Sequence, residues 1–219
     1  DNTTRNVIGS LILVRKDSVI TSIHELVGKR VGAIAPDAFG GYLLGYKALR
    51  EEGIDPEQDF TLRFSGFPAD ALLYLLRDGD INAAIIPVCL LENMDNEGLI
   101  NKEDYRPLLN YSTNTSCLTS TPLYPNWSFA ALDTVPDTLV DKVTRTLLND
   151  ESDTMKWGAP ASHSQVENLL REVNQHPRQR QLWQDAKIWA IQHRFIIGLS
   201  LGAIILLVFN QIWISYLVR

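Results

Sequence analysis

The chain has 219 residues, a net charge of −6 at pH 7 and 45% hydrophobic residues, which is enough for one α/β domain of ordinary size. The acidic balance, without any run of Lys or Arg, argues against a nucleic-acid partner. No GxSxG, HExxH or CxxC motif occurs, and the four histidines are isolated in sequence. We therefore expect no catalytic residues, no metal centre and no cofactor in this chain.

Short apolar runs alternate with helical patterns in the first ninety residues. Strands are predicted at 9–15, 31–35, 60–65 and 83–88, and helices at 20–26, 40–52 and 68–77. Gly53 is well placed to end the second of these helices, and Pro68 falls in the first turn of the third. This alternation predicts βαβ units and a mainly parallel sheet.

The pattern changes after Tyr105. Extended pieces at 107–111 and 128–132 flank a polar, turn-rich stretch, and helices are predicted at 136–150, 165–173 and 178–194. We expect the last of these helices to run without interruption into the apolar stretch that follows it.

That stretch, residues 195–218, reads FIIGLSLGAIILLVFNQIWISYLV and carries no formal charge. As a helix it would be about 36 Å long, which exceeds the roughly 30 Å of a hydrocarbon core. Trp213 and Tyr216 near its end suit the interfacial belt. The sequence therefore predicts a single transmembrane helix at 195–218, preceded by a juxtamembrane helical connector at 161–194.

Two strand-to-helix junctions carry candidate ligand-binding residues. The first contains Phe39, Gly40, Gly41 and Tyr42, and the second contains Ser65, Gly66 and Phe67. A helix start offers unpaired N–H groups and a positive dipole end, so it can hold an oxyanion without a basic side chain. Two such junctions after neighbouring parallel strands would face one crevice. The alternative for the first junction is that Asp37 caps the helix and the glycines allow tight packing, and the alternative for the second is an ordinary βα turn.

A third candidate lies in the polar stretch. Its candidate residues are Cys117, Thr119, Ser120, Thr121, Tyr124 and Trp127. Hydroxyl and aromatic groups at this density suit recognition of a small ligand, although a surface loop with buried aromatic rings has the same composition. Cys89 and Cys117 permit one disulfide but do not require it.

Several blocks, in order and spacing, resemble the phosphonate-type periplasmic binding proteins of ABC importers. The matching blocks are Val14-Arg15-Lys16-Asp17-Ser18, Gly28-Lys29-Arg30-Val31, Gly41-Tyr42-Leu43, Glu52-Gly53-Ile54, Ser65-Gly66-Phe67-Pro68-Ala69-Asp70 and Asn82-Ala83-Ala84. This resemblance covers about residues 7–150. Together with the Cys117–Trp127 loop, the C-terminal helix and the predicted membrane span, the chain is also similar to the periplasmic sensor region of tetrathionate-sensing histidine kinases.

The resemblance implies an α/β fold of the type II periplasmic-binding-protein class: a bilobal ligand-binding domain at 1–160, its N-terminal part missing, followed by the transmembrane helix. It also implies that the kinase region lies beyond Arg219 and that the three candidate segments line one cleft. The implied partners are a small oxyanion, membrane lipid, a second copy in a homodimer and a cytoplasmic response regulator. The implied location is the bacterial inner membrane, with the N-terminal domain in the periplasm.

The implied function is periplasmic sensing of tetrathionate or another sulfur oxyanion by a two-component sensor kinase. The alternative is a membrane-tethered solute-binding protein of a phosphonate or oxyanion importer. For a sulfur oxyanion, Cys117 is of interest because a thiolate attacks S–S bonds. A buried or disulfide-bonded Cys117 is the other interpretation.

Overall fold

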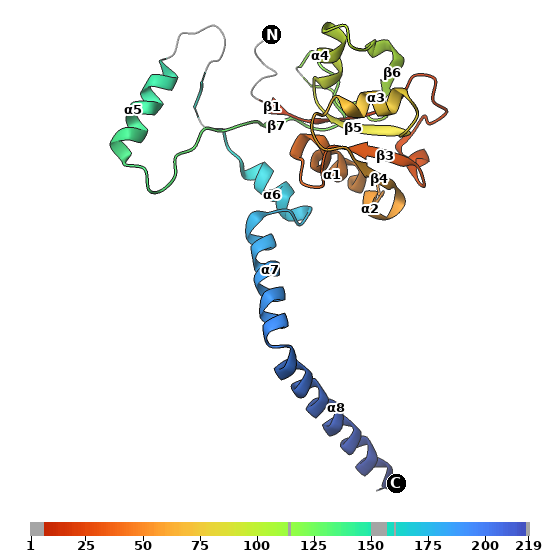
Figure 1. The fold of residues 1–219 in the computed structure, drawn as a ribbon, viewed down its shortest axis with the longest axis vertical. Helices are drawn as coiled ribbons and strands as arrows, with labels where there is room; N and C mark the ends of the chain where they lie inside the picture. Colours follow the sequence, from red (N-terminus) through yellow and green to blue (C-terminus); the bar gives the residue numbers. More distant parts are fainter. Residues whose placement is uncertain (1–6, 114, 150–156, 160, 218–219) are drawn as a thin grey trace. The chain divides into compact units, whose positions relative to one another are not determined.

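The computed structural model describes residues 7–113, 115–149, 157–159 and 161–217 (Figure 1). Contacts between residues divide the chain into two compact units, Asp1–Leu169 and Leu170–Arg219. The first unit contains all strands of the described part of the chain, and the second is helical.

A five-stranded mixed sheet forms the centre of the first unit (Figure 1). Its strands, in spatial order, are β4 (Thr61–Phe64), β3 (Arg30–Ala33), β5 (Ala83–Pro87), β2 (Ser10–Arg15) and β6 (Tyr105–Pro107). β3 pairs in parallel with β4 and β5, whereas β2 is antiparallel to both β5 and β6. The predicted strands are confirmed, but the prediction of a mainly parallel sheet was wrong, because β2 runs against both of its neighbours.

Helices cover both faces of this sheet. They are a 3₁₀ turn η1 (Ile23–Leu26), a π-helical turn η2 (Phe39–Leu43) that continues into α1 (Leu44–Glu51), the short α2 (Pro56–Asp59), α3 (Ala71–Arg77), α4 (Leu90–Asn96) and a 3₁₀ turn η3 (Lys102–Asp104). Gly53 follows α1 with φ +81°, in the left-handed region that glycine enters readily. The helices predicted at 20–26 and 68–77 are confirmed with shorter bounds, and the one predicted at 40–52 is found as η2 and α1 at 39–51, while α4 was not predicted.

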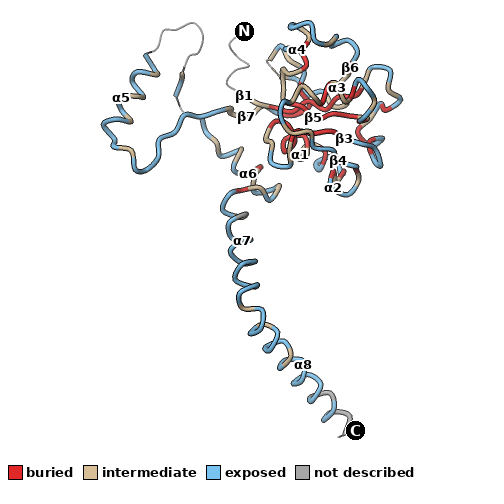
Figure 2. Tube along the Cα trace, viewed as in Figure 1, coloured by how far each residue is buried: buried red, intermediate tan, exposed pale blue. Residues whose placement is uncertain are grey.

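The core follows the alternation of β2 and β5. Leu11 and Leu13 of β2 share one hydrophobic cluster with Ala84 and Ile86 of β5. That cluster is completed from α3 and α4 by Leu72, Leu73, Leu76, Leu91 and Met94. On the opposite face, Ile85 lies against Gly45 of α1, where an added Cβ would be 2.6 Å from Ile85 Cγ2. Both faces are therefore buried, and Figure 2 shows the burial concentrated in these central strands.

The segments through which the chain enters and leaves this sheet lie side by side. β1 (Val7–Ile8) pairs antiparallel with β7 (Tyr124–Pro125), with Ile8 opposite Tyr124. Residues 9–123 thus form a lobe whose two connections meet in one two-stranded ribbon.

Four further helices follow the lobe. They are α5 (Asp137–Leu148), α6 (Ser164–Glu172), α7 (Pro177–Gln192) and α8 (Arg194–Leu217). These helices confirm the predicted helical segments at 136–150, 165–173 and 178–194, apart from Asp150, which lies outside the described residues. The uninterrupted helix expected after residue 178 was wrong, because α7 ends at His193 and α8 begins anew.

The membrane span was predicted at 195–218, of which Val218 lies outside the described residues. Within the described part of the chain, no helix is by itself both long and apolar enough to cross a bilayer. Gln181–Gln192 and Arg194–Asn210, bent by 74°, meet these requirements of length and composition only as a pair. The structure thus does not show the single span that the sequence predicted.

Candidate functional site

The carboxyl ends of β3, β4 and β5 meet at one edge of the sheet, and both predicted junctions lie there. The Ile34 N–H donates to the Gly41 carbonyl (3.2 Å), and the Gly66 N–H donates to the Ile34 carbonyl (2.9 Å). Ser10 Oγ, at the start of β2, donates to the Gly40 carbonyl (2.5 Å). Three segments far apart in the sequence are therefore tied together around the residue that follows β3.

The first backbone donors of the π-helical turn lack partners within the helix, and Gly40, Gly41 and Tyr42 are buried. The Leu43 N–H donates to the Ala38 carbonyl (3.0 Å), five residues back, so the N–H groups of residues 39–42 have no partner further back in the helix. An added Cβ at Gly40 would lie 2.6 Å from Ile8 Cδ1, and one at Gly41 would lie 2.3 Å from Ile34 Cδ1. The two glycines are thus required for tight packing, and the same packing brings the helix start against β1 and β3.

Tyr42 belongs to the core of the lobe. Its side chain is 3% exposed, and its ring contacts Phe64 (centroids 5.2 Å apart) and Tyr46 (5.6 Å). Burial raises the pKa of the Tyr42 hydroxyl far above its ordinary value, and the nearby carboxylate of Glu57 adds to this. The hydroxyl has no hydrogen-bond partner among the described residues. Tyr42 therefore contributes a backbone N–H to the edge, while its ring supports the turn from inside.

Two aromatic residues belong to the predicted junctions, Phe67 in the loop after β4 and Phe39 at the start of η2. Phe67 is 80% exposed in the loop after β4, where Gly66 has φ +73°. Phe39 makes an edge-to-face contact with Tyr124 of β7 (centroids 5.9 Å apart). Ser65 Oγ donates to the Gly66 carbonyl (3.1 Å), so this hydroxyl is already used within the loop.

Thr119, Ser120 and Thr121 are buried and bonded to the backbone. Ser120 Oγ accepts from the Ile12 N–H (2.9 Å) and donates to the Leu109 carbonyl (2.7 Å). Thr121 Oγ1 accepts from the Ser10 N–H (3.0 Å), and Thr119 Oγ1 donates to the Thr121 carbonyl (2.9 Å). The three hydroxyls therefore continue the edge of β2 beyond the end of β6, and they are structural groups that fasten the segment leaving the lobe.

Cys117 forms a disulfide with Cys89, with Cα atoms 5.1 Å apart. Since both cysteines of the chain are used, the free thiolate that would attack an S–S bond does not exist in this state, and that interpretation of Cys117 was wrong. Cys89 follows β5 and precedes α4 with φ +68°. Glu92 of α4 reinforces the same link, because its Oε1 accepts from the Leu118 N–H (2.8 Å). The segment that leaves the lobe is thus anchored to α4 at Cys117 by the disulfide and at Leu118 by this hydrogen bond.

Ser10 and Glu92 were not predicted as site residues. Ser10 joins the start of β2 to the π-helical turn, and Glu92 holds the exit segment. A polar residue at the head of an apolar strand is the only sequence signal for Ser10. Nothing in the sequence pattern distinguishes Glu92 from a solvated helix acid.

Basic side chains gather at the opposite edge of the sheet, around the turn before β5. Arg15 donates to the Arg77 carbonyl (3.3 Å), Arg30 donates to the Gly79 carbonyl (2.9 Å), and Arg63 pairs with Asp80 (3.8 Å). An anion at the carboxyl edge would therefore depend on backbone N–H groups and the helix dipole.

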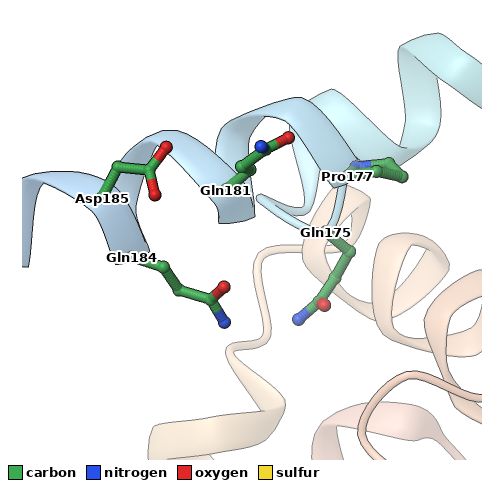
Figure 3. A pocket seen from close by; sticks show the side chains of 5 residues that line it. All are labelled: Gln175, Pro177, Gln181, Gln184 and Asp185. Carbon is green, nitrogen blue, oxygen red and sulfur yellow. The ribbon is translucent and has the colours of Figure 1, made fainter. Parts of the chain in front are cut away.

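Two further features are the predicted site residue Trp127 and a hollow in the second unit. Trp127 is 91% exposed two residues beyond β7. A hollow of about 570 Å³ in the second unit is lined by Gln175, Pro177, Gln181, Gln184 and Asp185 (Figure 3). The Asp185 carboxylate would repel an oxyanion, so this hollow does not suit the predicted ligand.

The lobe, its paired entry and exit strands and the helix start at its carboxyl edge define one lobe of a type II periplasmic binding protein. Residues 4–190 match the family of periplasmic substrate-binding proteins of phosphonate ABC transporters, so the chain belongs to that family. Over 215 residues, 98% of its length, the chain is 61% identical to the tetrathionate sensor histidine kinase TtrS of Salmonella typhimurium. It spans 36% of that protein's length. The resemblance to both groups expected from the sequence is thus confirmed.

Solved structures agree on the fold. PhnD1 of Prochlorococcus marinus, in complex with methylphosphonate, has a TM-score of 0.56 at 17% identity, over 78% of this chain and 68% of its own. XAC2383 of Xanthomonas citri, bound to ATP, has a TM-score of 0.54 at 16% identity, over 78% and 69%. At these identities the likeness establishes the type II binding-protein fold.

Proposed function

We propose that this chain is the periplasmic ligand-sensing region of a two-component sensor histidine kinase in the bacterial inner membrane. Its ligand is a small oxyanion, tetrathionate or another sulfur oxyanion, and a cytoplasmic response regulator receives the signal. The observation that carries this proposal is the 61% identity to a tetrathionate sensor kinase over nearly the whole chain.

The carboxyl edge of the sheet supports an oxyanion ligand. The N–H groups of residues 39–42, which have no partner further back in the helix, and the positive end of the helix that they begin favour negative charge. Phe39 and Tyr124 form an aromatic pair at the start of this helix, and Phe67 is exposed in the loop after β4. This edge contains donors without a basic side chain, which suits a ligand whose charge is spread over several oxygens.

The proposed signal leaves through α8 in the membrane. The large apolar side chains of α8 are exposed, including Leu199 (76%) and Leu206 (72%), and no charged residue follows Arg194 before Arg219. Ligand binding closes the lobe against the rest of the binding domain, the β1–β7 ribbon acts as the hinge, and α7 passes the movement to α8. A homodimer is part of this proposal.

Direct binding tests the ligand. The full-length protein in lipid nanodiscs is titrated with tetrathionate, thiosulfate, sulfate, phosphate and methylphosphonate, and the thermal stability of the binding domain is followed. We expect the largest shift with a sulfur oxyanion, and we expect Phe67→Ala to weaken that ligand about tenfold. Val19→Ala is the matched control, because Val19 is exposed at the opposite edge. No shift with any sulfur oxyanion would contradict the ligand assignment.

The importer alternative gains support from the family match alone. The gene on the C-terminal side of this segment decides between the two. A helical segment with a phosphoacceptor histidine followed by an ATP-binding domain is expected for the sensor, whereas an open reading frame that ends there would favour the tethered binding protein.

A further inference from the structure

Large apolar side chains of α7 are exposed among the residues that the structure describes. Leu182, Trp183 and Trp189 are 68%, 75% and 58% exposed. With Ala186 and Ala190 they recur at positions i, i+1, i+4, i+7 and i+8, so the five residues lie on one side of the helix, while Ile188 and Ile191 (54% and 58% exposed) lie on the other side. α7 is 16 residues long, about 24 Å, and two of the five tryptophans of the chain lie on this face.

A break at His193 gives α7 and α8 different directions. His193 ends α7, its ring stacks on Trp189 (centroids 4.8 Å, interplanar angle 23°), and its Nδ1 lies 2.9 Å from the Trp189 carbonyl oxygen. The two helical segments on either side are bent by 74°. A helix at this angle to one that follows the bilayer normal would lie about 16° from the membrane plane.

The charge of this segment is opposite to that of the chain as a whole. Residues 177–194 contain Arg178, Arg180, Lys187 and Arg194 against the single acid Asp185, in a chain whose net charge is −6. Tryptophan is enriched at membrane–water interfaces, and basic residues beside a membrane span bind anionic lipids.

We infer that α7 lies along the outer surface of the inner membrane as an interfacial helix. Its Leu182–Trp183–Trp189 face is immersed at the level of the headgroups, and its basic residues contact anionic phospholipid. This inference rests on the proposed placement of α8 in the bilayer. Movement of the binding domain would then reach α8 by a change in the tilt or depth of α7. A continuous straight helix between the binding domain and the membrane would not be needed.

Tryptophan depth measurements test the inference in the full chain. Single-tryptophan variants retain Trp189, Trp213 or Trp127 and carry phenylalanine at the other four positions. Each is reconstituted with lipids brominated either near the headgroup end or near the tail end of the acyl chain. We expect Trp189 to be quenched several-fold more by the shallow bromines than by the deep ones, and Trp127 to be quenched by neither.

The Trp213 variant separates the two proposals. If Trp213 is not quenched, the placement of α8 in the bilayer fails. If Trp213 is quenched while Trp189 is not, α8 is in the membrane and the interfacial placement of α7 is overturned. Equal quenching of Trp189 by shallow and deep bromines would also overturn it, because α7 would then enter the bilayer end on.

The lipid headgroup is tested with brominated phosphatidylglycerol against brominated phosphatidylcholine. We expect the anionic lipid to quench Trp189 more, and Lys187→Gln to reduce that preference by up to about fivefold. Arg145→Gln in α5 removes the same charge elsewhere and should leave the preference unchanged. Equal quenching by both lipids, or protection of Trp189 that depends on protein concentration, would overturn the lipid assignment; the latter would indicate a second copy as the partner.

Discussion

β2 and α8 are both strongly apolar, and the structure surrounds them differently. Residues Ser10–Val14 of β2 are completely buried, because β5 and β6 flank the strand and helices cover both faces. In α8 the large apolar side chains face outward along most of its described length. High hydropathy therefore indicates that a segment requires apolar surroundings. It does not indicate whether other parts of the same chain provide them.

The difference has an energetic basis. Fully burying a leucine or isoleucine side chain contributes about 1.5–3 kcal/mol, and the lobe gathers more than a dozen such residues into a continuous core. Among the residues that the structure describes, the large apolar side chains of α8 are exposed and gain little of this stabilisation. In the proposal made above, lipid supplies the apolar surroundings that β2 has in the lobe.

We expect Leu72→Ala to have the largest effect on stability of the substitutions proposed here. A small effect would contradict the contrast between the buried strands of the lobe and the exposed α8. Leu72 is 0% exposed between α3 and the sheet, so its truncation removes buried contacts and leaves a cavity. We expect the free energy of unfolding of the lobe to fall by about 4 kcal/mol, measured by urea denaturation. Leu199→Ala in α8 is the matched control and should change it by less than about 0.5 kcal/mol. Equal losses for the two variants would mean that α8 packs on the lobe.

The double variant Cys89→Ser with Cys117→Ser should have the next largest effect. The disulfide closes a loop of 28 residues, so its removal should lower the free energy of unfolding by about 3 kcal/mol. Denaturation of the unmodified chain with and without a reducing agent gives the same quantity independently. The variant should still respond to a sulfur oxyanion, because the disulfide acts by fastening the exit segment to α4. Loss of the response with the lobe still folded would contradict that role.

The fold of the lobe could be predicted largely from local pattern. The runs at 9–15, 31–35, 60–65 and 83–88 are strands because each is short, apolar and bounded by turn residues. The direction of β2 could not be predicted in this way. It depends on β5 lying between β2 and β3, a neighbour seventy residues away, and no local spacing encodes that arrangement.

The proximity of the two junctions could be predicted from the sequence, whereas the hydrogen-bond partners of the candidate hydroxyls could not. The junctions at Gly40–Gly41 and Ser65–Gly66 do lie at one sheet edge, as the parallel strands require. The hydroxyls of residues 119–121 suggested ligand contacts because sequence shows composition without partners. Their partners are backbone groups of β2 about 110 positions away, which only the folded chain reveals.

Ser120→Ala sharpens the distinction between a structural and a binding hydroxyl. It removes the acceptor of the buried Ile12 N–H and the donor to the Leu109 carbonyl. Because these groups cannot reach water, we expect a loss of about 2 kcal/mol in the free energy of unfolding and unchanged ligand affinity. Ser116→Ala, at an exposed position of the same segment, should cost less than about 0.5 kcal/mol. Weaker ligand binding with unchanged stability would assign Ser120 to the site instead.

Glu25→Gln should give the smallest effect, since it tests the exposed surface of the lobe. The Glu25 carboxylate accepts from the Thr21 N–H (2.5 Å) and the Ser22 N–H (3.2 Å), and these bonds lower its pKa below the ordinary value. A lowered pKa in the folded state means that the stabilisation is complete above the ordinary carboxyl pKa and is lost as the pH falls through the folded pKa. Glu25→Gln should therefore lower stability slightly near neutral pH and leave it unchanged in acid. An NMR titration of the Glu25 carboxyl measures its pKa. Denaturation near neutral pH and in acid, with Glu103→Gln as the control variant, measures the change in stability. A difference that grows toward low pH would show that the carboxylate is not bound by these two amides, because the sign of the dependence would be reversed.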